Sequence, residues 1–299
     1  MNNYDNVPNY NNNYYVDNNN IKLQNLNNNK SVNIINGEHY NFRGRNMELS
    51  NDPLSVLSQS GSCTVVQTIE MLEILAGYET KNRYNVFVKT LQGNSIFLFQ
   101  CKEDSDYCTR YYCKGDSRPF KMLVNHVNSS NPNQKFGEGN LYCVFDRPFK
   151  CTCLCFQRPK VTCYLNHNNI KVGEITEPCT CCSPHFNINS FDKIDKTFQI
   201  HSSCCQCGLI CKDNICGACS DVKFPIYRGN TSSYNDSNQI GLINKVSRDI
   251  ATEIISDADT FEISFPSDSS PEDKLLIIGT TLLIDYRYFE MNPMENNQQ

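Results

Sequence analysis

The sequence predicts an all-β domain with one buried helix near its C-terminus. From residue 54 onward the chain carries many short apolar runs rich in Val, Ile, Phe and Tyr, several of which alternate with polar residues. Turn signals such as Gly93-Asn94 separate these runs, and amphipathic helical patterns between them are almost absent, which indicates a sandwich or barrel. A different run, residues 275–284, is apolar on nearly every face and is typical of a buried helix.

The elements follow from this pattern in chain order. Residues 1–49 hold 18 Asn and too little apolar surface to offset the entropy of ordering, so we expect a disordered tail. Residues 50–291 should form the folded domain, and 292–299 a short polar tail. Strands are predicted at 65–75, 84–90, 95–100, 141–145, 161–165, 185–191, 197–201 and 224–227.

The C-terminal helix has a clear start signal. Ser270 is suited to the N-cap, Pro271 to the first helical position and Asp273 to the first turn. Only ten uncharged residues separate Lys274 from Asp285. They would cover about 15 Å, half of a hydrocarbon core of about 30 Å. A helix wrapped by strands therefore fits better than one in lipid.

Charge and cysteine content limit the possible functions. The chain has 27 Lys and Arg against 32 Asp and Glu, a net charge of -5, so no basic field for nucleic acid is expected. Residues 1–20 are polar and lack the apolar stretch of a signal peptide, which predicts a cytosolic location. There the 18 cysteines should be free, bind metal or carry lipid rather than form structural disulfides.

One cysteine cluster suits lipid attachment. Cys151, Cys153 and Cys155 alternate along the chain, and the flanking cations are Arg147, Lys150, Arg158 and Lys160. Exposed thiols beside cations are suited to S-acylation near an anionic membrane surface, and stable anchoring needs two or more acyl chains. The alternative is that these cysteines are ordinary small apolar residues of a strand.

Two other clusters leave a metal site open. One is Cys179, Cys181 and Cys182, followed by His185. The other contains two CxxC pairs, Cys204 with Cys207 and Cys216 with Cys219, which is a pattern of tetrahedral Zn²⁺ sites. The short spacer and the additional Cys205 and Cys211 leave acylation and free thiols as alternatives.

An acidic segment is a candidate calcium site. Asp257, Asp259 and Asp268 stand at positions 1, 3 and 12 of a twelve-residue window, and oxygen ligands are those that Ca²⁺ prefers. Glu262 stands where such a loop needs Gly, so an EF-hand is not expected. The alternative is a plain strand, because Phe261, Ile263 and Phe265 alternate as one face.

No motif for covalent chemistry is present. The sequence lacks GxSxG, P-loop, HExxH and Rossmann fingerprints, and its five His are scattered. We therefore expect no catalytic residues and no enzyme.

Five blocks, in order, resemble the phospholipid scramblase family over residues 54–290. They are 71–84 (MLEILAGYETKNRY), 108–120 (CTRYYCKGDSRPF), 146–151 (DRPFKC), 257–266 (DADTFEISFP) and 284–290 (IDYRYFE). The resemblance implies a tubby-like fold, in which a closed twelve-stranded barrel surrounds the hydrophobic C-terminal helix. It also implies palmitoylation at the cluster of Cys151, Cys153 and Cys155. Calcium binding is implied for the segment that contains Asp257, Asp259, Phe261, Ile263, Phe265 and Asp268.

The resulting hypothesis is a Ca²⁺-dependent, ATP-independent mover of phospholipids between leaflets. It would work at the cytosolic face of the plasma membrane, held by acyl chains or by the C-terminal helix as a single pass, with an anionic phospholipid membrane as its partner. The alternative is a soluble zinc- or lipid-binding tubby-like adaptor with no transport activity.

Overall fold

A computed structural model gives the fold. It describes residues 52–68, 81–112, 118–127, 139–150, 158–166, 169–180, 183–191, 193, 197–210, 221–246 and 259–289, and the backbone of four short strands nearer the N-terminus. These four form two antiparallel hairpins, β1 (Tyr14–Asp17) with β2 (Asn20–Leu23) and β3 (Ile34–Ile35) with β4 (Glu38–His39). They belong to a compact unit, Met1–Glu48 with Ser130–Asn133, separate from the rest of the chain. The disorder predicted for residues 1–49 stays a prediction.

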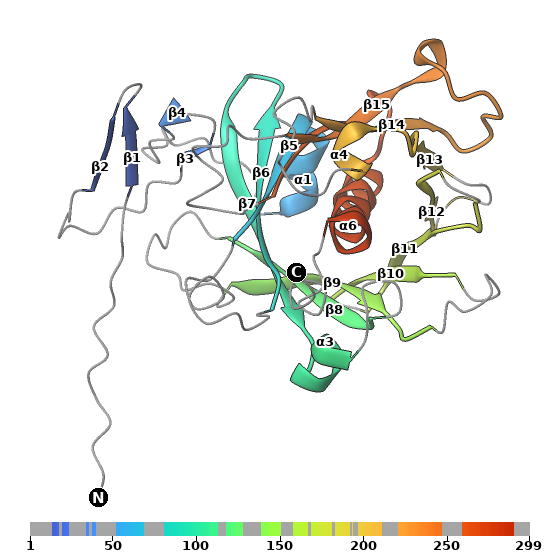
Figure 1. Ribbon diagram of the computed structural model, residues 1–299, viewed down its shortest axis with the longest axis horizontal. Helices are drawn as coiled ribbons and strands as arrows, with labels where there is room; N and C mark the ends of the chain where they lie inside the picture. The colour runs from blue at the N-terminus through green and yellow to red at the C-terminus, as the bar shows by residue number, and fades with distance from the viewer. Residues whose placement is uncertain are drawn as a thin grey trace, which may run out of the picture. The chain divides into compact units, whose positions relative to one another are not determined.

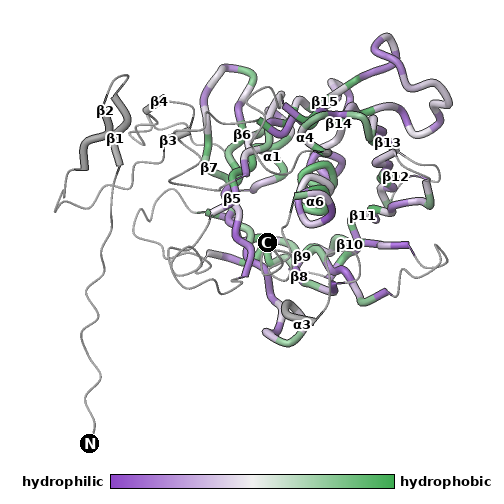
Figure 2. Tube along the Cα trace, viewed as in Figure 1, coloured by the Kyte–Doolittle hydropathy of each residue, from purple (hydrophilic) through white to green (hydrophobic). Residues whose placement is uncertain are grey.

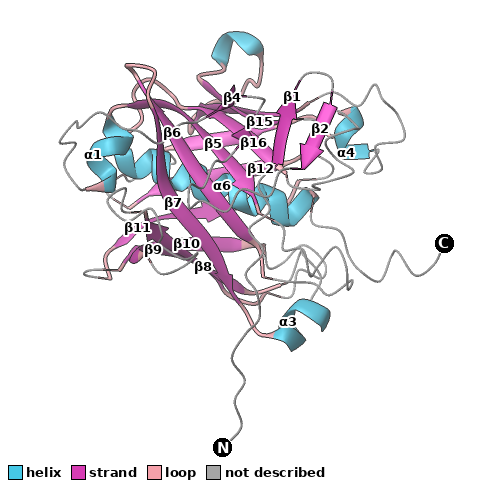
Figure 3. Cartoon of the chain, turned by 90° about the vertical axis from the view of Figure 1, so that its left-hand side faces the viewer, coloured by secondary structure: helices cyan, strands magenta, loops and turns pink. Residues whose placement is uncertain are grey.

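The second unit is built around a closed barrel. Twelve strands, β5 to β16, pair antiparallel in chain order, and β16 pairs with β5 to close the ring. Figure 1 shows the helix α6 (Pro271–Tyr288) end-on inside this ring, and Figure 3 shows it lengthwise. The predicted twelve-stranded barrel around a C-terminal helix is therefore confirmed. The strands are β5 (Ser60–Gln67), β6 (Arg83–Thr90), β7 (Ser95–Asp104), β8 (Phe120–His126), β9 (Asn140–Arg147), β10 (Lys160–Leu165), β11 (Lys171–Thr176), β12 (His185–Ser190), β13 (Phe198–His201), β14 (Val222–Arg228), β15 (Gly241–Val246) and β16 (Thr260–Ser264).

Short helices lie on the connections. They are α1 (Pro53–Ser58), α3 (Tyr107–Tyr112), α4 (Cys207–Ile210) and the 3₁₀ turn η2 (Asp236–Asn238). The predicted strand at 65–75 overlaps the end of β5, and its second half lies outside the described residues. Strands β8, β11 and β15 were not predicted.

Helix α6 is the centre of the hydrophobic core. Its apolar middle, seen in green in Figure 2, is buried on all sides, in keeping with residues that show no polar face. The close approach of the helix to the wall depends on glycine. A Cβ on Gly279 would lie 2.2 Å from Cε1 of Phe145, and one on Gly173 of β11 would lie 2.5 Å from Cδ1 of Leu276.

The start of α6 is fixed by the signals that the sequence contains. The Ser270 hydroxyl accepts from the backbone N–H of Asp273 at 3.2 Å, and the Asp273 carboxylate accepts from the backbone N–H of Ser270 at 3.0 Å, with Pro271 in the first turn. Lys274 is buried and its Nζ donates to the carbonyls of Leu57 at 2.9 Å and Ser60 at 2.8 Å. These contacts hold the beginning of the helix to α1 and β5.

Candidate functional site

The barrel has one end at which α6 finishes, and we call it the C-terminal rim. It is marked by the end of β7 at Asp104 and the start of β16 at Thr260. Because consecutive strands are antiparallel, every second connection joins strands at this rim: β5–β6, β7–β8, β9–β10, β11–β12, β13–β14 and β15–β16. The connections that contain the predicted cysteine clusters and the start of the acidic segment are among these.

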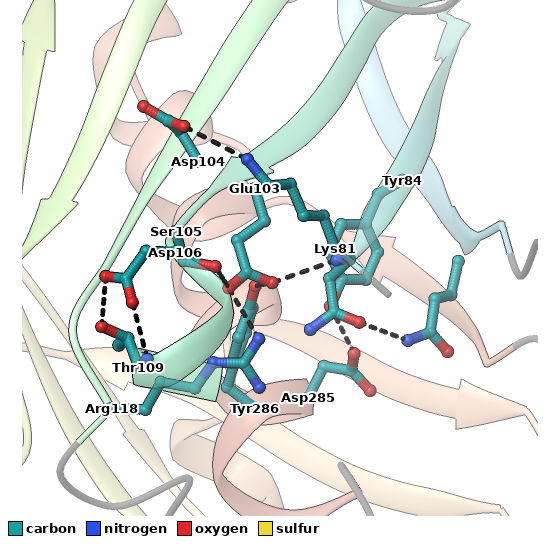
Figure 4. A network of polar contacts seen from close by, with 12 residues as sticks. Lys81, Tyr84, Glu103, Asp104, Ser105, Asp106, Thr109, Arg118, Asp285 and Tyr286 are labelled. Carbon is teal, nitrogen blue, oxygen red and sulfur yellow. Dashed lines mark hydrogen bonds and ion pairs between the residues drawn. The ribbon is translucent and has the colours of Figure 1, made fainter. Parts of the chain in front are cut away.

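A buried ion pair lies at the C-terminal rim beside the helix. Arg118 donates from its guanidinium to Oε1 of Glu103 at 2.6 Å, and the two side chains are 2% and 0% exposed. Tyr286 of α6 donates its hydroxyl to Oε2 of the same carboxylate at 2.7 Å (Figure 4). Ser105 and the backbone N–H of Asn82 also donate to it.

The electrostatics of this network are set by competing effects. Burial by itself would raise the pKa of Glu103, but the Arg118 charge and the hydrogen bonds from Ser105, Asn82 and Tyr286 outweigh it, so the pKa lies below its ordinary value. The Glu103 carboxylate is therefore ionised and holds the helix through Tyr286.

A second acid of α6 lies at the same rim. Asp285 is 2% exposed, and its Oδ2 accepts from the Tyr84 hydroxyl at 2.5 Å (Figure 4). Its carboxyl group lies within hydrogen-bonding reach of Asp259, which precedes β16. Burial raises the pKa of Asp285 well above the ordinary value for Asp, and the negative charge of Asp259 adds to this effect. Asp259 is in turn paired with Lys245 of β15 at 2.8 Å.

The residues of the predicted calcium segment are separated by the fold. Asp257 lies outside the described residues, whereas Asp259 is at the C-terminal rim. Asp268 follows the far end of β16 and pairs there with Arg228. The five residues of β16, at about 3.3 Å each, place the two acids roughly 16 Å or more apart, too far to share one ion with bonds of about 2.5 Å. The structure thus does not bring Asp268 to Asp259.

The apolar members of that segment belong to the core. The side chains of Phe261, Ile263 and Phe265 are buried inside the barrel, while Glu262 is exposed on the outside of β16. These three residues could offer a metal only backbone carbonyl oxygens. The strand interpretation therefore accounts for their alternation.

The cations beside the predicted acylation cluster are largely occupied by the protein itself. Cys151, Cys153 and Cys155 lie outside the described residues, but the flanking residues are described. Arg147 is buried, Arg158 pairs with Glu177 at 2.7 Å and Lys160 pairs with Glu174 at 2.6 Å. These three cations are therefore less available to anionic lipid than the sequence indicates.

The predicted zinc ligands are only partly described. Cys204 is half-buried and Cys207 is exposed at the start of α4, whereas Cys216 and Cys219 lie outside the described residues. The Sγ atoms of Cys204 and Cys205 are 3.9 Å apart. Within the part of the chain that the structure describes, no group of three or more His, Cys, Asp or Glu side chains is arranged to hold a metal ion.

Four other cysteines are core residues. Cys63, Cys101, Cys143 and Cys163 are buried in β5, β7, β9 and β10. Burial raises the pKa of Cys101 to about 12, and it also raises the pKa values of Cys63 and Cys143 above the ordinary value for Cys. These thiols pack as small apolar side chains. By contrast, the exposed described cysteines, Cys108, Cys179, Cys205 and Cys207, all lie on connections at the C-terminal rim.

Helices long and apolar enough to span a bilayer were not found among the described residues.

Comparisons with known proteins identify the class to which this barrel belongs. A family model described as Scramblase matches residues 44–291, which include the whole barrel and α6. Phospholipid scramblase 2 of Bos taurus is 31% identical over 244 residues, covering 80% of this chain and 71% of the relative. Phospholipid scramblase 1 of Mus musculus is 29% identical over 252 residues, covering 82% and 66%. Human phospholipid scramblase family member 5 is 26% identical over 244 residues, covering 79% and 77%.

The chain therefore belongs to the scramblase family, as the resemblance indicated. It spans about two thirds of the length of several of the relatives it matches.

Sequence reasoning missed three of the residues that hold the end of the helix. Glu103, Arg118 and Lys245 lie on strands or connections far from α6 in the chain, and nothing local distinguishes them from surface charges. One signal was available: Asp285 interrupts a run of apolar residues, and a buried acid needs partners.

Proposed function

We propose that this protein moves phospholipids between the two leaflets of a membrane, without ATP and in response to Ca²⁺, at the cytosolic face of the plasma membrane. The observation that carries the proposal is the family match across the entire barrel and its central helix, with relatives named phospholipid scramblases. No step in this function requires covalent chemistry, in keeping with a chain in which we expect no catalytic residues.

The acidic residues at the C-terminal rim support the calcium dependence. Asp285 is buried and, among the described residues, no donor reaches its Oδ1. Once Asp285 is ionised, this oxygen and the carboxylate of Asp259 together suit a hard cation that takes oxygen ligands. These residues fit calcium, which would supply positive charge at this rim.

Acyl anchoring is the second part of the proposal. The β9–β10 connection joins its strands at the C-terminal rim and contains Cys151, Cys153 and Cys155. Two or more acyl chains there would hold the rim at the membrane surface, because one chain gives only marginal and reversible binding.

Transport is tested with the purified full chain in liposomes that carry a fluorescent phospholipid in both leaflets. A membrane-impermeant quencher should remove about half of the signal without Ca²⁺ and nearly all of it when Ca²⁺ is added, in the absence of ATP. A loss of only half of the signal in both conditions, with protein bound to the liposomes, would favour the lipid-binding adaptor.

Anchoring is tested by changing Cys151, Cys153 and Cys155 together to Ala. The variant should move from the membrane fraction to the cytosolic fraction, and wild type should lose its anchors in hydroxylamine. A triple Ala variant of Cys204, Cys205 and Cys207, which follow a strand at the same rim, is the matched control and should stay at the membrane. Undiminished membrane recovery of the first variant would exclude an acyl anchor at this cluster.

A further inference from the structure

The pairing of Asp259 and Asp285 suggests which residues respond to calcium, an inference that rests on the proposed calcium dependence. Asp259 comes from the acidic segment before β16 and Asp285 from the last turns of α6. The two carboxyl groups lie within hydrogen-bonding reach of each other although 25 intervening residues separate them in the chain. Neither a loop motif nor sequence spacing links them; the position of the helix inside the barrel does.

A positive side chain already lies against this acid pair. Nζ of Lys245 is 2.8 Å from Oδ1 of Asp259, and it also lies 4.0 Å from the centroid of the Phe289 ring, directly after α6. The charge of Lys245 acts on Asp285 as well. One ammonium therefore serves two carboxyl groups, and Oδ1 of Asp285 has no donor among the described residues.

We propose that Asp259 and Asp285 together bind the calcium ion, and that Lys245 occupies this place in the calcium-free protein. Calcium takes six to eight oxygens, and two carboxylates can supply up to four of them. Water can supply others, because the side chains of Lys245 and Asp259 are 23% and 21% exposed. The C-terminal end of α6 also carries the negative end of the helix dipole, which favours a cation.

Binding of calcium has a consequence for the end of the helix. Displaced from Asp259, Lys245 also leaves the Phe289 ring, which packs against Phe224 and Phe261 in the core. The ion would thus replace the contact between Lys245 of β15 and Phe289, the residue after α6. In its place it would link Asp259, just before β16, to Asp285 of α6.

Asp268 has no part in this site. It lies beyond the opposite end of β16 and is paired with Arg228. The substitution Asp268→Asn is therefore a matched control: it removes one carboxylate of the same segment without touching the proposed pair.

The test is calorimetric titration of the full chain with Ca²⁺, supported by Tb³⁺ luminescence excited through tyrosine. Tb³⁺ bound by Asp285 would lie next to the Tyr84 ring, and the chain contains no Trp to compete. Lys245→Met should lower the Kd for Ca²⁺ about tenfold, because calcium no longer competes with an ammonium group. Asp285→Asn, which can keep the hydrogen bond from Tyr84, should raise the Kd about tenfold or more and reduce the Tb³⁺ signal.

The outcomes separate this inference from the proposed function. Unchanged affinity in Asp285→Asn, with lost affinity in Asp268→Asn, would overturn the site while calcium-dependent transport stands. Unchanged affinity for Ca²⁺ in Lys245→Met would overturn the role of the lysine. The expected gain in affinity cannot arise from misfolding, because a misfolded variant would lose the site. No calcium binding and no calcium effect on transport in wild type would remove the proposed calcium dependence itself.

Discussion

The buried ion pair between Arg118 and Glu103 gives the sharpest test of how α6 is held. Replacing Arg118 by Met keeps most of the side-chain volume but leaves the Glu103 carboxylate, which is 0% exposed, without its countercharge. Removing one partner of a buried pair costs about 3–5 kcal/mol of unfolding free energy. For a domain of this size that corresponds to a fall in Tm of about 6–20 °C.

Urea denaturation followed by circular dichroism measures this loss, and a second variant tests its cause. Adding Glu103→Gln to Arg118→Met removes the unpaired charge while an amide oxygen still accepts from Tyr286, so we expect most of the lost stability to return. A double variant no more stable than Arg118→Met would show that the loss comes from packing rather than from charge.

The pH dependence of stability provides an independent check on the same pair. In wild type the pKa of Glu103 lies below its unfolded value, so the stability it contributes is present at neutral pH and is lost as the pH falls below about 4.3, the pKa of an unperturbed Glu. In Arg118→Met, burial of Glu103 remains and the countercharge is gone, which raises the pKa. The difference in unfolding free energy between the two proteins should therefore shrink as the pH falls from 7 towards 4.5, and a constant difference would refute this reasoning.

Two further substitutions test the packing of the helix. Leu283→Asp should unfold the domain, at a cost above about 5 kcal/mol, because Leu283 is 1% exposed and belongs to the apolar core, where a new carboxylate would be buried. Leu91→Asp, at a position 77% exposed, is the control and should change the unfolding free energy by less than about 0.5 kcal/mol. Gly279→Ala should lower the unfolding free energy by about 1–3 kcal/mol despite the better helix propensity of Ala, because its Cβ would lie 2.2 Å from Phe145. Adding Phe145→Leu should restore part of the lost stability, as measured by thermal unfolding.

Much of the barrel could be predicted from local patterns. Alternation in residues such as 84–90 locates a strand because one face of every barrel strand contacts the core. Strand β11 was missed because Gly173 and Glu174 weaken its pattern, and a Cβ at Gly173 would lie 2.5 Å both from the carbonyl oxygen of Asn189 in β12 and from Cδ1 of Leu276 in α6. A glycine required by close approach of a distant helix cannot be distinguished in the sequence from one that ends a strand. The closure of twelve strands came from the family resemblance and not from periodicity.

The candidate site was predictable only in part, because it is assembled from distant segments. Tyr286 and Glu103 are 183 residues apart, and Asp285 and Tyr84 are 201 apart. Composition and spacing identified Asp259 as an acid of interest but grouped it with Asp268, its neighbour in the segment. In the barrel Asp259 instead faces Asp285, because an extended strand separates the two ends of a sequence motif that a loop would bring together.

The distribution of polar residues along α6 explains why a ligand at the C-terminal rim can act on the helix. Burial of apolar surface has no direction of its own, and the position of the apolar middle is set by its close packing at Gly279 and Gly173. The two ends are set by polar contacts, with Lys274 held by the carbonyls of α1 and β5, and Arg287 held by Glu177 at 3.1 Å. A buried charge moved away from its partners by even one residue would lose them, which is costly. The contact of Lys245 with Asp259 is partly exposed, so in the proposed site a cation that displaces Lys245 would act on the end of α6 while its beginning stays fixed.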